Sequence, residues 1–156
     1  MQSGQDTNPV LYYDDLAVGR VFRTDSVEVT TEEIIEFARR YDPQVFHTDP
    51  VAAAETLFGG LVASGWLTAA LTMRLMVLGE FHFGRGVVGL GVESLRWPKP
   101  VRPGDVLSAT VEVAAMRVSE SKPEHGIVRI ATTTRNQHDE VVQTMVSNVL
   151  VRRRAA

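Results

Sequence analysis

The hydrophobic and polar positions in the first part of the chain follow two different periods. From Val21 to Val29, apolar and polar residues roughly alternate, which predicts a strand with one buried face. Beyond it, apolar residues recur every three or four positions up to Tyr41, which is the period of an amphipathic helix. Thr30 and Glu33 form a capping-box pattern at the start of this helix, and Pro43 marks its end.

A short second helix is predicted to follow. Asp49 and Pro50 have the residue types preferred at the N-cap and at the first helical position. We expect this helix to run through Leu57, until Gly59 and Gly60 stop it.

The longest apolar stretch of the chain, from Leu57 to Leu78, contains the third predicted helix. It begins near Ser64 or Gly65 and ends at Gly79. Apolar residues occupy nearly every face, so we expect this helix to be central and wrapped by other elements. Its continuous part has about a dozen residues, fewer than the about 20 that cross a hydrocarbon core, so no membrane contact is expected.

The second half of the chain is rich in Val, Ile and Thr and is divided by Gly, Pro and polar turns. This pattern predicts four strands, at Val87–Trp97, Val106–Val118, Ile127–Thr134 and Val141–Val151. Together the elements indicate an α+β domain in which an antiparallel sheet curls around the long apolar helix. Because one sheet around one helix leaves an apolar edge uncovered, we expect a homodimer or a higher homo-oligomer, with the helices near its axis.

The composition is that of an ordinary globular protein, and it excludes several kinds of function. The 156 residues are enough for one sizeable core. The absence of cysteine excludes disulfide scaffolds, thiolate metal sites and cysteine nucleophiles. Sixteen basic and 19 acidic residues give a net charge of −3, so no overall field favours nucleic acid.

The sequence predicts a division of the chain into three segments. We expect a flexible polar leader over residues 1–10, a single domain over 11–152 and a basic C-terminal tail over 153–156, whose arginines we interpret as solvated. The leader has neither the basic region nor the apolar core of a secretory signal, which favours a cytoplasmic location.

The residues that suggest chemistry lie around the end of the first helix. Asp42 and His47 are five residues apart, and a loop there can turn both side chains into one cavity as base and acid. Ser64 and Gly65 stand at the start of the apolar helix, where free backbone N–H groups can hold an oxyanion. Taken alone, the pair would more often be a turn carboxylate and a loop histidine.

These landmarks, taken in order, resemble the MaoC-like dehydratases, the family of (R)-specific enoyl-CoA hydratases. The family pattern is roughly F-A-x-x-x-x-D-x-N-P-hydrophobic-H-x-D-P, then A and F, then H-G. Matching positions here are Phe37-Ala38, Asp42, His47, Asp49-Pro50, Ala54, Phe58 and Gly65, with the segment Tyr13–Gly19 before them and the turn Trp97–Asp105 after them. The resemblance covers most of the chain and implies the hot-dog fold.

The resemblance also implies an activity. Asp42 and His47 match the catalytic pair, which holds a water, and the backbone N–H of Gly65 matches the donor to the thioester carbonyl. The implied reaction is that of a hydro-lyase, the reversible addition of water to a 2-enoyl-CoA giving a 3-hydroxyacyl-CoA. An acyl-CoA is the expected small-molecule partner, and no metal or separate cofactor is implied.

Aromatic and cationic residues near the motif are candidates for substrate binding. We expect the aromatic side chains of Phe46, Phe58 and Trp66 to border the acyl tunnel. Arg96, Lys99 and Arg102 are candidates for binding the nucleotide phosphates.

Two positions depart from the family pattern. Gln44-Val45 stands where the family has Asn-Pro, and the proline is at Pro43 instead. We therefore expect the backbone that orients Asp42 to differ from that of the family, and the hydrogen bonds of the family's Asn to be missing. Ser64 replaces the histidine of the His-Gly pair; we interpret it first as an N-cap and only second as an auxiliary group of the site.

Other functions are compatible with the same pattern. In a thioesterase of this fold, the carboxylate would assist attack of water on the carbonyl carbon. The departures at Gln44 and Ser64 favour a non-catalytic acyl-thioester-binding subunit. The G-x-G-x-x-G match at 84–89 follows a helix and leads into a strand, the reverse of a dinucleotide-binding context, so it predicts no such site.

Overall fold

A five-stranded antiparallel sheet curves around one long helix in this protein, for which a computed structural model describes residues 9–155. Residues 1–8, which make up most of the predicted leader, and residue 156 lie outside the described residues. The strands are β1 (Val21–Glu28), β2 (Val88–Arg96), β3 (Val106–Val118), β4 (His125–Arg135) and β5 (Val141–Arg152). Their order in the sheet is β1-β3-β4-β5-β2, and every neighbouring pair is antiparallel.

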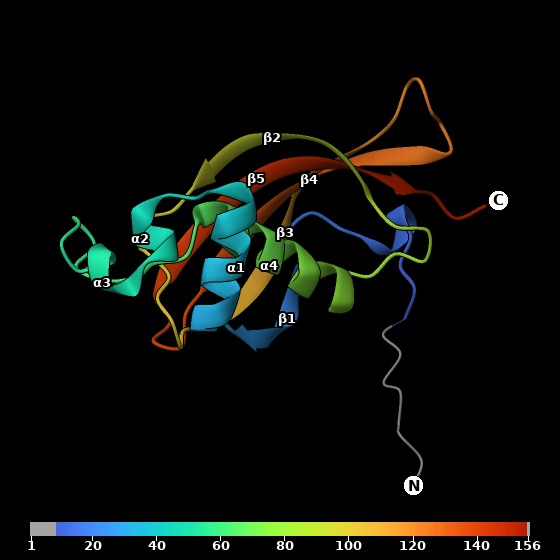
Figure 1. The fold of residues 1–156 in the computed structure, drawn as a ribbon. Coiled ribbons are helices and arrows are strands. Elements are labelled where there is room, and N and C mark those ends of the chain that lie inside the picture. The colour runs from blue at the N-terminus through green and yellow to red at the C-terminus, as the bar shows by residue number, and fades with distance from the viewer. Residues whose placement is uncertain (1–8, 156) are drawn as a thin grey trace, which may run out of the picture.

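The central helix lies inside the curve of this sheet, as predicted. Figure 1 shows the sheet arching over α4 (Gly65–Leu78), with the other helices on the same concave side. Ile34 of α1 (Thr31–Tyr41) belongs to the same buried cluster as Leu67 and Leu71 of α4. The α+β class and the hot-dog arrangement are therefore confirmed.

The short helices differ in part from the prediction. Asp49 caps α3 (Pro50–Ala53) by accepting the backbone N–H groups of Val51 and Ala52, at 3.0 and 3.1 Å. The prediction that α3 reaches Leu57 is wrong, because the bonds after it span only three residues, as from Thr56 N–H to the Ala53 carbonyl. The sequence pattern also missed η1 (Tyr13–Asp15) and α2 (Val45–Thr48), since each is a single turn without a period of its own.

Helix α4 is covered on one side only. Its buried positions recur in helical steps and include two threonines: Leu67, Thr68, Leu71, Thr72, Leu75 and Met76. On the other side, Trp66, Met73, Val77 and Leu78 are about half exposed or more. The expectation of a helix wrapped on nearly all sides therefore fails within one chain, because one sheet can cover only one side of a helix.

The edge strand β2 is also exposed along most of its length. Val88, Leu90 and Val92 are each more than half exposed, although β2 pairs with β5 on its inner side. An apolar edge strand of this kind lies open to pairing with another chain. No helix within residues 9–155 is long and apolar enough to cross a membrane.

The C-terminal arginines are partly bound to the fold. The Arg154 guanidinium donates to the Asp15 carboxylate at 2.6 Å and lies over the Tyr12 ring at 4.7 Å. The Arg153 guanidinium donates to the carbonyl of Pro123 at 2.9 Å. Both side chains therefore have partners from distant segments, which the local sequence does not reveal, while the side chain of Arg154 stays 54% exposed to solvent.

Candidate active site

A cavity of about 350 Å³ opens at the N-terminal end of α4. Its walls come from the α1–α2 segment, from the first turn of α4 and from the loop that follows β2. The residues that line it are Asp42, Gln44, Phe46, His47, Phe58, Val62, Ala63, Gly65, Trp66, Thr68, Trp97, Lys99, Pro100, Val101 and Val142.

Asp42 and His47 meet at this cavity. Asp42 is the C-cap of α1, with φ −150° and ψ 68°, and His47 lies in α2. His47 Nε2 lies 3.3 Å from Asp42 Oδ2, and the two side chains are 8% and 18% exposed. On its other side, His47 Nδ1 lies 2.7 Å from the carbonyl oxygen of Val62. Because that oxygen can only accept, Nδ1 carries the hydrogen and Nε2 is left facing Asp42.

Both oxygens of the Asp42 carboxylate receive hydrogen bonds. Gln44 Nε2 donates to Oδ1 at 2.7 Å, and Ser64 Oγ donates to Oδ2 at 2.7 Å. Burial by itself would raise the pKa of the Asp42 carboxyl, but these bonds, together with the adjacent His47, outweigh it and hold that pKa below its ordinary value. Asp42 is therefore ionised at neutral pH and acts as an acceptor.

Ser64 both caps α4 and contacts the carboxylate. Its Oγ accepts the N–H of Trp66 at 3.3 Å while donating to Asp42. The N-cap interpretation of Ser64 is therefore confirmed, and the same hydroxyl also holds the candidate base. The N–H of Gly65, at the first position of α4, points along the helix axis without an intrahelical partner, as N–H groups of a first turn do.

Trp97 packs directly on Gly65. A Cβ atom added at residue 65 would fall 2.4 Å from Cε2 of the indole, so only glycine fits there. The indole N–H donates to Gln143 Oε1 at 2.9 Å, and Gln143 is fully buried in β5. Trp66 meets the same indole edge-on, with ring centroids 5.4 Å apart. This contact fixes one wall of the cavity beside the free N–H of Gly65.

The aromatic residues predicted for substrate binding lie at the cavity. Phe46, Phe58 and Trp66 all line it, and the Phe46 and Phe58 rings meet edge-on at 5.1 Å. Lys99 lines it as well, but its ammonium is paired with the Glu140 carboxylate. A pocket wall of aromatic side chains beside few polar groups is typical of small-molecule sites.

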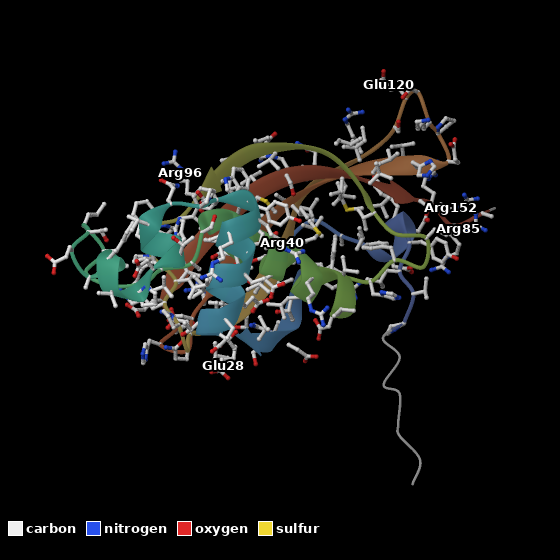
Figure 2. The ribbon with its side chains drawn as sticks, in the orientation of Figure 1. Glu28, Arg40, Arg85, Arg96, Glu120 and Arg152 are labelled. Atoms are coloured by element: carbon white, nitrogen blue, oxygen red, sulfur yellow. The ribbon has the colours of Figure 1, made fainter. Side chains whose placement is uncertain are left out.

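The two arginines predicted to bind phosphates are not among the residues that line this cavity. Arg102 Nη2 donates to the carbonyl of Phe58 at 2.8 Å, and its backbone N–H donates to Asp105. Arg102 therefore supports the loop that carries Phe58. Figure 2 shows Arg96, at the end of β2, projecting away from the ribbon.

Several residues of the site escaped the sequence analysis. Val62 contributes only a backbone carbonyl, which no side-chain pattern can reveal. Trp97 was noted only as part of a turn, and Gln44 only as a departure from the family pattern. Within residues 9–155, no three His, Asp or Glu side chains form a group that could hold a metal ion.

Comparison with known proteins identifies the family. The family model described as MaoC like domain matches residues 15–137. The Bacillus subtilis protein YdeM, described as uncharacterized, is 32% identical over 140 residues, which cover 90% of this chain and 98% of YdeM. A 3-hydroxybutyryl-CoA dehydratase of Methylorubrum extorquens is 36% identical over 134 residues, covering 85% of this chain and 79% of that enzyme.

Solved structures agree with this match. A MaoC-like dehydratase from Rhodospirillum rubrum superposes with a TM-score of 0.89 and 45% identity, covering 94% of this chain and 99% of the other. An (R)-hydratase from Aeromonas caviae superposes with a TM-score of 0.71 and 32% identity, covering 86% and 96%.

Proposed function

Because the chain belongs to the MaoC-like dehydratase family, we propose that it adds water reversibly to a 2-enoyl-CoA and forms a 3-hydroxyacyl-CoA. The observation that carries this proposal is the 3.3 Å contact between Asp42 Oδ2 and His47 Nε2 at a cavity that also contains Gly65. The relative from Methylorubrum extorquens, whose name describes dehydration of a hydroxyacyl-CoA, supports the same class of substrate.

Each group has a role in the proposed reaction. The ionised Asp42 accepts a proton from the water as its oxygen attacks the β-carbon. In this step His47 acts as the imidazolium: its Nδ1–H stays bonded to the Val62 carbonyl, and the second proton, on Nε2, passes to the α-carbon. The negative charge that develops on the thioester oxygen is bound by the N–H of Gly65 at the start of α4. The proton taken up by Asp42 then returns to His47 across their contact, so the pair ends as it began.

The remaining wall residues shape the binding of the substrate. We propose that Phe46, Phe58 and Trp66 contact the acyl chain, since their rings cover the cavity next to the reacting groups. Lys99 remains a candidate for the phosphates of the coenzyme A arm if its pair with Glu140 opens.

We also propose that the protein acts as a homodimer or a larger homo-oligomer. The exposed side of α4 and the exposed strand β2 both carry large apolar side chains. A second copy that covers both would remove from water an apolar surface unusual for a monomer.

The test is an assay with crotonyl-CoA in which enoyl absorbance and free thiol are followed together. Loss of the absorbance without thiol release is the expected result. Asp42→Asn and His47→Ala should each lower kcat/KM by about 10²- to 10⁴-fold, the usual contribution of a general acid or base. His138→Ala is the matched control, because this exposed histidine lies in the β4–β5 turn, and it should leave the rate unchanged.

Two other outcomes would contradict the proposal. Free coenzyme A without a hydroxyacyl product would identify a thioesterase. Binding of the acyl-CoA without any turnover, whatever residue stands at positions 42 and 47, would identify a non-catalytic binding subunit.

A further inference from the structure

Gln44 is held at the edge of the cavity by its backbone. Its N–H donates to the Asp42 carbonyl at 2.8 Å, which closes a three-residue turn around Pro43. Its own carbonyl accepts the His47 N–H at 3.0 Å and the Thr48 hydroxyl at 3.1 Å. These three bonds fix the Gln44 backbone relative to both Asp42 and His47.

The side chain of Gln44 then reaches back to the candidate base. Its Nε2 donates to Asp42 Oδ1 at 2.7 Å, on the oxygen that neither Ser64 nor His47 contacts. The carboxylate is thereby held at both oxygens, and its Oδ2 is kept toward His47. The side chain of Gln44 is exposed to the cavity, so this donor lies beside the expected substrate.

We propose that Gln44 is a positioning residue of the reaction, whose amide orients the Asp42 carboxylate and keeps it ionised while the substrate is bound. This inference rests on the proposed hydratase function. It also gives a new interpretation of Gln44, which departs from the family pattern. Its amide supports catalysis, whereas the departure by itself favoured a non-catalytic subunit.

No titratable side chain of the cavity lining can replace Gln44 as the donor to Asp42 Oδ1. Of the residues lining the cavity, His47 and Lys99 are the titratable ones besides Asp42. His47 contacts Oδ2, and Lys99 is paired with Glu140. The hydrogen bond from Gln44 is accordingly one of the two largest influences that lower the pKa of Asp42, the other being the bond from Ser64.

The test replaces Gln44 by side chains of similar size that lack the donor. Gln44→Leu removes the amide, and Gln44→Glu places a second carboxylate beside Oδ1. Because activity requires ionised Asp42, the acid limb of the kcat/KM profile lies at the pKa of this group in the free enzyme. Loss of the donor raises the pKa of Asp42, so the acid limb should move to higher pH in Gln44→Leu. It should move further in Gln44→Glu, because the second carboxylate repels the ionised form of Asp42. At neutral pH, kcat should fall about tenfold in Gln44→Leu, the rate equivalent of one charge-assisted hydrogen bond.

Gln137→Leu is the matched control. Gln137 Nε2 donates to the Asp105 carboxylate at 2.9 Å, so this change removes a bond of the same chemistry on the surface, outside the cavity lining. It also removes the acceptor of the Val106 N–H, which lies at the surface as well. It should leave the acid limb in place. An acid limb in Gln44→Leu at the wild-type pH would overturn the proposal, even if kcat falls.

A second measurement separates this proposal from the proposed reaction. The ¹³C carboxyl resonance of Asp42, assigned by its absence in Asp42→Asn, can be titrated in the ligand-free protein. It should titrate at higher pH in Gln44→Leu than in wild type, whether or not crotonyl-CoA is hydrated. An unchanged titration would show that Gln44 does not influence the ionisation of Asp42, and would overturn this proposal. A shifted titration in a protein that does not hydrate crotonyl-CoA would refute the proposed reaction and leave the role of Gln44 standing.

Discussion

At the scale of single residues, Ser64 has two functions in one hydroxyl group. It accepts the Trp66 N–H as the N-cap of α4 and donates to Asp42 Oδ2. The first bond joins residues two apart and could be predicted from the residue type and position. The second joins residues 22 apart, so no local pattern could reveal it.

We predict that Ser64→Ala lowers both stability and activity. Loss of the cap should reduce the free energy of unfolding by about 1 kcal/mol. Loss of the hydrogen bond that Ser64 donates to Asp42 should in addition lower kcat/KM by about tenfold, since a bond to a charged group is lost. Urea denaturation and the hydration assay measure the two effects separately.

Thr30→Ala serves as the comparison for Ser64→Ala. Thr30 caps α1 by accepting the Glu33 N–H at 3.2 Å, and it lies outside the cavity lining. It should cost a similar free energy of unfolding and leave kcat/KM unchanged. Equal activities of the two variants would mean that Ser64 acts as a cap alone.

At the scale of elements, the start of α4 depends on its contact with the loop after β2. The indole of Trp97 occupies the space that a side chain at residue 65 would need, and Gln143 of β5 holds that indole by its N–H. Three separate segments of the chain thus determine where the first N–H groups of α4 point.

Gly65→Ala should displace either the indole or the start of the helix. The added methyl group would lie 2.4 Å from Cε2 of Trp97, far inside contact distance. Overpacking of this kind costs about 1 to 3 kcal/mol of unfolding free energy. Denaturation midpoints measure the loss, and we also expect reduced hydration, because the N–H of residue 65 moves.

Gly60→Ala tests whether any added methyl group near the site has this effect. Its Cβ would lie 3.5 Å from the Arg102 guanidinium, an ordinary van der Waals contact. It should therefore be clearly less destabilising than Gly65→Ala. A Gly65→Ala protein as stable as Gly60→Ala would refute the role given to the Trp97 contact.

At the scale of the whole molecule, α4 and β2 each leave apolar side chains exposed. This exposed apolar surface consists of Trp66, Met73, Val77 and Leu78 from the helix and Val88, Leu90 and Val92 from the strand. The period of the sequence predicted a helix that is apolar on nearly every face. The curvature of the sheet decided which faces of α4 are covered within the same chain.

We predict that sedimentation will show a dimer or a larger oligomer, and that Leu90→Glu will shift it toward the monomer. A carboxylate at this exposed apolar position of β2 would have to be buried in the interface, where an unpaired charge is costly. Val51→Glu is the control, because Val51 is 83% exposed on α3, outside this surface. A monomeric wild-type protein, or an oligomer unaffected by Leu90→Glu, would contradict the proposed interface.

The sequence by itself determined the features that depend on neighbours within a few residues. The strand and helix periods, the caps at Thr30, Asp49 and Ser64 and the bounds of β3 follow from local backbone geometry and from the alternation of apolar side chains. The order of short motifs along the chain, from Tyr13–Gly19 through Asp42 and His47 to Trp97–Asp105, also identified the family, since each motif consists of neighbouring residues.

Only the tertiary structure decided how distant segments share one site. It brought Ser64 to Asp42, the Val62 carbonyl to His47 and Trp97 against Gly65, and it turned Arg102 to the Phe58 carbonyl instead of the cavity. The physical reason is that such contacts depend on strand register and on the path of loops between packed elements. Those depend on burial over the whole domain rather than on any short stretch of sequence.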